Sequence, residues 1–167
     1  MLRLRPYKAC DADTIVTWIG DEIAFRKWCA DRYDHYPISA DDINDHYDAV
    51  KNDENFYQFT AFDETGIVGH LIMRFTDEEK KILRFGFVIV DPEKRGRGYG
   101  KKMLELAIRY AFEILKTEKI TLAAFDNNPD AIRCYKSVGF KEITPEKERP
   151  FLVLGEEWKR VEMEIER

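Results

Sequence analysis

The chain has 167 residues, of which 44% are hydrophobic and 35% charged, and it carries a formal net charge of −5. This length and composition predict one globular domain, residues 1–167, with a proper hydrophobic core. The acidic balance argues against a general nucleic-acid binder, and no apolar run approaches the roughly 18 residues of a membrane span.

The N-terminus and the cysteines indicate a cellular compartment. The first residues contain no apolar run followed by a small-residue cleavage site, which argues against secretion. Three widely spaced cysteines, Cys10, Cys29 and Cys134, fit reduced thiols better than a disulfide framework. We therefore expect a cytoplasmic protein without a membrane partner.

Two helices are expected in the first third of the chain. Asp11 or Asp13 is a candidate cap for a short apolar helix that includes Trp18. Residues 21–37 are rich in aromatic and acidic side chains and show no clean period. Ser39 precedes a second helix, in which apolar residues recur at three- and four-residue spacing.

Two further helices are expected in the second half. Asn128, Pro129 and Asp130 open one of them as cap, first helical residue and first-turn acid, and Gly139 closes it in a left-handed conformation. The other is longer and precedes it. Its apolar stripe consists of Met103, Leu104, Ala107, Ala111, Ile114 and Leu115.

Strand patterns are distributed along the whole chain. Because strands follow one another directly in places and alternate with helices elsewhere, we expect a mixed sheet covered by helices. A turn at residues 63–66 joins two of the strands. The expected strands are residues 2–7, 56–62, 67–75, 82–90, 120–125, 140–143 and 158–165.

A basic, glycine-rich stretch follows the fourth expected strand. Residues 94–102 contain five cations, three glycines and no carboxylate, in a protein that is acidic overall. A strand, a glycine turn and a helix start together predict a phosphate site, because free amides and the helix dipole attract anions. A solvated basic turn is the plain alternative. The cations are Lys94, Arg95, Arg97, Lys101 and Lys102.

The spacing of the glycines narrows the kind of phosphate ligand. A P-loop requires Ser or Thr after its Gly-Lys pair, whereas Lys102 follows here. The dinucleotide fingerprint G-x-G-x-x-G also does not fit Gly96, Gly98 and Gly100. The pattern that fits is [Q/R]-x-x-G-x-[G/A], which starts at Arg95.

With the downstream NNPDAIRCYKSVGF, this pattern resembles the GNAT superfamily of N-acetyltransferases, most closely the bacterial branch that includes ribosomal-protein acetyltransferases. The resemblance is clear over residues 85–143. It implies an α/β (α+β) GNAT fold, with a mixed, mostly antiparallel sheet of about seven strands and about four flanking helices. Acetyl-CoA would bind between two splayed parallel strands ending at Val90 and Phe125.

The resemblance assigns cofactor contacts residue by residue. The backbone of the last residues before the turn would pair with pantetheine, and the turn amides would hold the pyrophosphate. Asn128 matches a cofactor-contacting asparagine, which competes with its capping role. The implied set is Val88, Ile89, Val90, Arg95, Gly96, Arg97, Gly98, Tyr99, Gly100, Lys101, Asn128, Arg133 and Tyr135.

Tyr135 matches the tyrosine that protonates the leaving thiolate in this family, although a core tyrosine on an apolar helix face is the alternative. An amide near Val88 is the expected oxyanion donor. Cys134 has no evident base partner, which argues against a nucleophilic cysteine.

The sequence leaves the identity of the general base open. Some relatives carry a glutamate where this chain has Ala123, and the strand before the turn offers no carboxylate. His35 and His46 are interpreted as plain surface residues, so no metal is expected. The candidates are Asp31, Asp34, His35, Glu148 and a water chain.

Acceptor specificity in this family comes from segments matching residues 21–48 and 144–157. The first contains many carboxylates, and it contains or adjoins several aromatic rings, which suits a cationic amine. Core aromatics and solvated acids are an equal alternative. The carboxylates are Asp21, Glu22, Asp31, Asp34, Asp41, Asp42, Asp45 and Asp48; the rings are Trp18, Phe25, Trp28, Tyr33 and Tyr36.

The leading hypothesis is an enzyme that transfers the acetyl group of acetyl-CoA to a primary amine, on a protein N-terminus or a small cationic molecule. A catalytically silent CoA-binding module is the alternative, because no base is obvious. Dimers are common in the family, so the resemblance also points to a possible homodimer.

Overall fold

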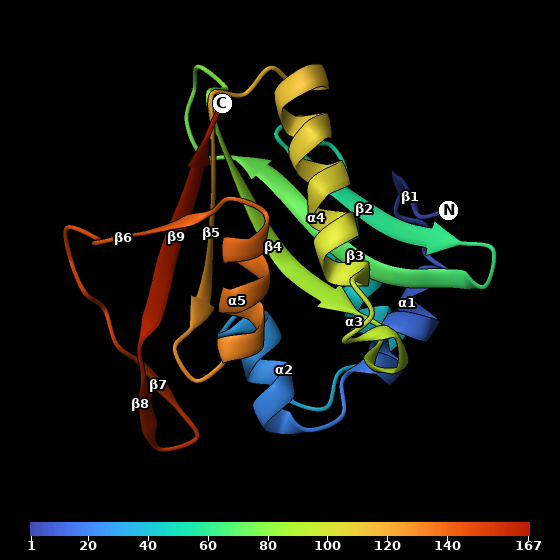
Figure 1. Ribbon diagram of the computed structural model, residues 1–167. Coiled ribbons are helices and arrows are strands. Elements are labelled where there is room, and N and C mark those ends of the chain that lie inside the picture. The colour runs from blue at the N-terminus through green and yellow to red at the C-terminus, as the bar shows by residue number, and fades with distance from the viewer.

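A seven-stranded sheet runs through the computed structural model, which describes all 167 residues (Figure 1). Its order is β1-β2-β3-β4-β5-β9-β6, and every neighbouring pair is antiparallel except β4 and β5. The mixed, mostly antiparallel sheet predicted above is confirmed. The strands are β1 (Arg3–Pro6), β2 (Phe56–Asp63), β3 (Gly66–Phe75), β4 (Ile82–Val90), β5 (Lys119–Phe125), β6 (Lys141–Ile143) and β9 (Arg160–Glu166).

The predicted last strand is divided. A separate hairpin of β7 (Phe151–Val153) and β8 (Glu156–Trp158) precedes β9 and projects beyond the sheet (Figure 1). Trp158 therefore ends the hairpin rather than beginning the sheet strand. Its ring packs edge-on against Phe125 at the end of β5, with ring centroids 5.1 Å apart, which fixes the hairpin to the body.

Five α-helices flank the sheet, α4 and α5 in front of it in Figure 1 and the other three behind and below it. The helix missed by the sequence patterns is α2, in the segment without a clean period. Asp21 caps it by accepting a hydrogen bond from the Ala24 amide at 2.7 Å. The helices are α1 (Asp11–Ile15), α2 (Glu22–Cys29), α3 (Ala40–Asp48), α4 (Tyr99–Arg109) and α5 (Pro129–Ser137).

The starts of α3 and α1 test the predicted N-cap residues. Ser39 and Asp42 form a reciprocal capping box at α3, so that predicted start is confirmed. The capping prediction for Asp11 and Asp13 is wrong, because Cys10 occupies the cap position. Asp11 is instead buried and accepts two hydrogen bonds from Arg5, both at 2.8 Å.

The apolar stripe of α4 is confirmed for its first four members, all of which are buried. Ile114 is 64% exposed, so its assignment to the stripe is wrong. A π-helical turn at Tyr110–Ile114 follows α4 and widens the helix. This turn rotates later side chains away from the α-helical period, which explains the exposure.

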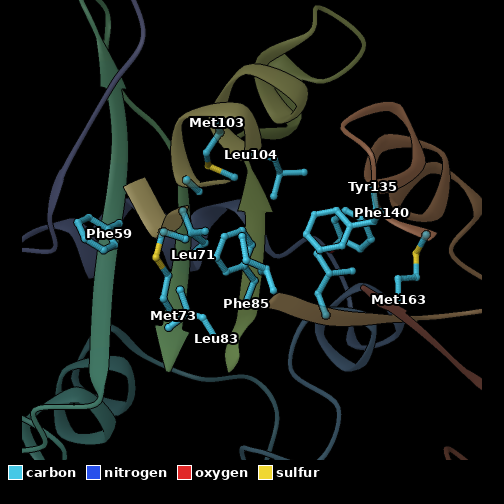
Figure 2. Close-up of a cluster of buried hydrophobic side chains, with 14 of the residues drawn as sticks. Phe59, Leu71, Met73, Leu83, Phe85, Met103, Leu104, Tyr135, Phe140 and Met163 are labelled. Atoms are coloured by element: carbon cyan, nitrogen blue, oxygen red, sulfur yellow. The ribbon is translucent and has the colours of Figure 1, made fainter. Parts of the chain in front are cut away.

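The sheet separates two hydrophobic clusters. The larger packs α4 and α5 onto one face and includes Phe85, Leu104 and Tyr135 (Figure 2). The smaller packs α1, α2 and α3 onto the other face and includes Phe25 and Phe87. Each fully buried large apolar side chain contributes about 1.5–3 kcal/mol, so both clusters fix helices relative to the strands. None of the helices has the length and apolarity needed to cross a bilayer.

Candidate active site

The parallel strands β4 and β5 pair only near their beginnings. Their register joins Ile82, Leu83 and Arg84 to Lys119–Thr121, and no pairing follows. Figure 1 shows the two strands starting together and diverging toward their ends. The edge of β4 beyond Arg84 therefore presents backbone groups that β5 does not take up, which suits an extended ligand. This opening lies where the sequence predicted the cofactor cleft.

A β-bulge interrupts β4 inside this opening. Between its pairs with His70 and Ile72 of β3, β4 has two residues, Phe87 and Val88, where β3 has one. Phe87 has φ +47°, an unfavourable region for a bulky residue, costing about 1–3 kcal/mol. The bulge also reverses side-chain alternation: Phe85 belongs to the cluster under α4 and α5, whereas Phe87 belongs to the other. The two faces of the sheet thus meet at this point.

The glycine stretch forms a tight turn into α4. Gly96 and Gly98 have φ +74° and +81°, and Gly98 is the N-cap residue of the helix. No atom lies within 4 Å of the position that a Cβ would take at either glycine. The amides of residues 99–101 precede the first intrahelical acceptor and are free. Bare backbone, open space and free donors are the features that an anion site requires.

The cations of this turn divide into two groups. Arg95 donates from Nε to the Val90 carbonyl at 3.2 Å, and Lys94 donates to the Thr65 hydroxyl at 3.1 Å. These two bonds fix the turn to the end of β4 and to the β2–β3 turn. The other three cations are exposed and make no hydrogen bond or ion pair within the chain; they are Arg97, Lys101 and Lys102.

The start of α4 is fixed on two sides. The Tyr99 hydroxyl donates to Asp63 at 3.0 Å, so its side chain points to the β2–β3 turn and only its amide remains for a ligand. At Gly100 a Cβ would lie 3.4 Å from Cys134 Sγ and 3.7 Å from Val90. The third glycine therefore lies where α4, α5 and β4 approach one another.

Helix α5 supplies the remaining predicted residues. Asn128 occupies the N-cap position of α5, as predicted, but its side chain makes no capping bond and is available to a ligand. Arg133 is exposed and pairs with Asp130. Tyr135 is 7% exposed and packs near Phe140 at a centroid distance of 6.3 Å (Figure 2). Its hydroxyl has no hydrogen-bond partner in the chain, and burial raises its pKa, so it remains protonated at neutral pH.

The predicted base candidates lie at the surface. The His35 ring bonds Asp34 at 2.6 Å and Asp42 at 3.3 Å, and these bonds raise the His35 pKa and lower that of Asp34. Asp31 is exposed. Glu148 pairs with Lys159 at 3.4 Å across an exposed pair. The raised pKa favours the protonated form of His35, and all four candidate side chains are exposed to solvent rather than enclosed in a site.

A carboxylate does occupy the sheet beside Ala123. Glu162 on β9 is directly paired with Ala123 and lines a hollow of about 340 Å³ next to the 145–150 loop. Arg84 approaches its carboxylate at 3.1 Å and Arg160 at 2.8 Å. Two guanidinium partners thus engage it as part of a structural ion-pair network.

The aromatic residues within or beside residues 21–48, the segment expected to bind the acceptor, fall into two groups. Trp18, Phe25 and Tyr33 are buried, as the core alternative required, whereas Trp28 and Tyr36 are half-buried. Trp28 stacks on Tyr33, with centroids 6.0 Å apart and planes 12° apart. The indole Nε1 and the Tyr33 hydroxyl are both buried without a hydrogen-bond partner.

The surface interpretation is wrong for His46, although His35 is indeed exposed. His46 is half-buried, and its ring lies 5.3 Å from that of Tyr33 and 5.6 Å from that of Phe87. The sequence contained a signal for this burial. His46 lies three residues after Ile43 on an amphipathic helix, and residues i and i+3 share a helix face. No group of three or more His, Cys, Asp or Glu side chains is arranged to hold a metal ion.

Diverging parallel strands, a bulge at the opening and a glycine turn into a helix define an acyl-CoA N-acyltransferase fold. The sequence model of the Acetyltransferase (GNAT) family matches residues 22–140, well over half of the chain. The chain belongs to this family.

Two individual relatives match a smaller part of the chain than the family model does. A probable spermine N(1)-acetyltransferase of Bacillus subtilis subsp. natto is 42% identical over 52 residues, 31% of this chain. A spermidine N(1)-acetyltransferase of Vibrio cholerae is 36% identical over 55 residues, 33% of this chain. These matches span 34% and 32% of the two relatives, about a third of their length.

A solved structure of spermidine N-acetyltransferase from Vibrio cholerae, in complex with CoA and spermine, superposes with a TM-score of 0.83. The superposition covers 99% of this chain and 95% of that one at 23% identity, which establishes the shared fold.

Proposed function

We propose that the protein is an acetyl-CoA-dependent N-acetyltransferase. The observation that carries the proposal is the unpaired edge of β4 leading directly into the free amides at the start of α4. The backbone of Val88, Ile89 and Val90 would bind pantetheine as an added strand, and the turn from Gly96 to Lys101 would bind the pyrophosphate. Arg97, Lys101 and Lys102 supply unpaired positive charge for a multiply charged anion.

The site then performs a direct transfer. A neutral amine attacks the thioester carbonyl, a C–N bond forms, and the C–S bond breaks. The Val88 amide, beside the bulge, would stabilise the oxyanion. Tyr135 would protonate the departing thiolate, because its hydroxyl is protonated and unpartnered. Asn128, released from capping, would contact the cofactor next to the thioester, and the exposed Arg133 would contact its polar part.

We propose a small polycationic amine as the acceptor. Support comes from the spermine and spermidine acetyltransferases among the relatives and from the exposed carboxylates beside Trp28 and Tyr33. Neutralising Asp31 and Asp34 together should raise the acceptor KM and leave the CoA affinity unchanged. An unchanged acceptor KM would exclude these two residues from binding. The homodimer and the cytoplasmic location remain predictions.

The direct test measures thiol release from acetyl-CoA with spermine, spermidine and a peptide bearing a free N-terminus. We expect amine-dependent turnover that is fastest with a polyamine, and calorimetric binding of CoA with no comparable binding of ATP. CoA binding without turnover on any amine would favour the silent module. No heat with acetyl-CoA at millimolar concentration would refute the cofactor assignment itself.

A further inference from the structure

The ring of His46 contacts three aromatic rings near the β4 bulge. Its ring is 5.3 Å from Tyr33, 5.7 Å from Tyr47 and 5.6 Å from Phe87, measured between centroids. The contact with Phe87 is edge-on, with planes 86° apart. Neither ring nitrogen makes a hydrogen bond or ion pair within the chain. A half-buried imidazole therefore lies against the strained residue that precedes Val88.

The groups around His46 keep it neutral. Burial lowers its pKa, and the nearby Arg32 lowers it further. The two tyrosines that face it are themselves uncharged, because burial raises the pKa of Tyr33 and of Tyr47. Asp42, one turn earlier on α3, is engaged by Ser39 and His35. At neutral pH one ring nitrogen of His46 thus carries a free lone pair.

Two buried polar atoms near the bulge have no hydrogen-bond partner within the chain. Tyr33 is only 6% exposed, yet its hydroxyl has no partner, and the same holds for the buried Nε1 of Trp28. Leaving a buried polar atom unpaired costs about 1–3 kcal/mol, so native structures rarely keep two of them together without use. Trp28 also contacts Phe87, at a centroid distance of 5.1 Å. Trp28 and Tyr33 therefore both pack on Phe87, as His46 does.

We propose that His46 is the proton acceptor for the attacking amine, on the sheet face opposite Tyr135. The assignment rests on the proposed acetyltransferase function. As the amine nitrogen bonds to the thioester carbon, its N–H becomes acidic and its proton passes to the free imidazole nitrogen, directly or through one water. The thiolate leaves with the proton of Tyr135. His46 then loses its proton to solvent, and Tyr135 regains one.

The bulge explains how acid and base reach one carbon from two faces. Tyr135 belongs to the cluster under α4 and α5, whereas His46 packs on Phe87 in the other cluster. The attacking nitrogen and the leaving sulfur occupy different corners of the tetrahedral carbon, so an acid and a base on different sides of the strand would each serve one of them. The half-buried Trp28 would then bind the incoming amine through its ring face.

The test compares His46→Gln with His35→Gln, a matched change at an exposed histidine. We expect His46→Gln to lower kcat at pH 7 by about 10²- to 10⁴-fold with unchanged CoA affinity. Because the His35 ring bonds Asp34, His35→Gln should change at most the acceptor KM, and its kcat at saturating amine should stay within about twofold of wild type. Wild-type kcat at saturating amine should fall as the pH drops through a pKa below 6.5. His46→Gln should lack this fall.

Chemical rescue separates catalysis from folding. Added imidazole should restore part of the turnover of His46→Ala and none of that of Tyr135→Phe, which lacks the acid. The role of His46 would be overturned if His46→Gln kept the kcat of the wild-type protein. It would also be overturned if the kcat of the wild-type protein did not fall at acidic pH. Wild-type protein that acetylates no amine would instead overturn the proposed function, so the two failures are distinguishable.

Discussion

Replacing Gly98 with alanine tests whether this glycine serves an anion site or only relieves backbone strain. Gly98 has φ +81° with no atom within 4 Å of a Cβ, and Gly155, in the distant β7–β8 hairpin, has the same φ and the same open space. Each Gly→Ala change therefore introduces the same left-handed strain, about 1–2 kcal/mol. For a chain of this size, we expect both melting temperatures to fall by about 2–8 °C.

The two variants should differ in CoA binding. A methyl group at Gly98 enters the space where the pyrophosphate would approach the amides of α4. Losing one charge-assisted hydrogen bond costs about 1.5–3 kcal/mol, which weakens the CoA Kd about 10- to 100-fold. Calorimetry on both variants measures this directly, and Gly155→Ala should bind CoA as wild type does. Equal affinities in both variants would refute the assignment of the turn to the pyrophosphate.

Three further outcomes follow from the geometry. Tyr135→Phe should lower kcat by at least about 10²-fold with unchanged CoA affinity and melting temperature, because the lost hydroxyl has no partner in the chain; unchanged turnover would exclude the acid role. Gly100→Ala should fold and bind CoA normally, since a Cβ would meet Cys134 at an ordinary 3.4 Å; lost binding would contradict this. Burial disfavours charge on Asp11, but hydrogen bonds led by Arg5 outweigh it and lower its pKa. Asp11→Ala should therefore cost about 3 kcal/mol in urea unfolding at pH 7, and the difference should shrink below about pH 4, as the lowered pKa requires; a pH-independent difference would exclude the charge as its source.

The positions of the proposed acid and base depend on one backbone irregularity. Without the bulge at Phe87, side chains of β4 would keep strict alternation, and Phe85 and Phe87 would lie on the same face. The extra residue sends Phe87 toward α3 and leaves Val88 at the open edge. The strain of the bulge is thus located where the reaction would take place, as strain often is at functional sites.

Local sequence signals determined much of the fold. The apolar strand, the three glycines and the stripe after them specified a strand, a tight turn and a helix, because φ > 0 and apolar periodicity are properties of neighbouring residues. Ser39 and Asp42 specified the start of α3 in the same way. The position of the glycine turn and of the helix start could therefore be predicted before any contact was known.

Tertiary structure alone decided the rest. The bulge and the burial of His46 depend on strands and helices far apart in the chain, and so does the divergence of β4 and β5, which only the family resemblance had implied. Asp11 leaves its predicted cap because Arg5 and Thr60 offer it stronger hydrogen bonds across the fold. A residue's neighbours in sequence set its conformational preference, but its pKa, burial and partners come from packing between distant segments.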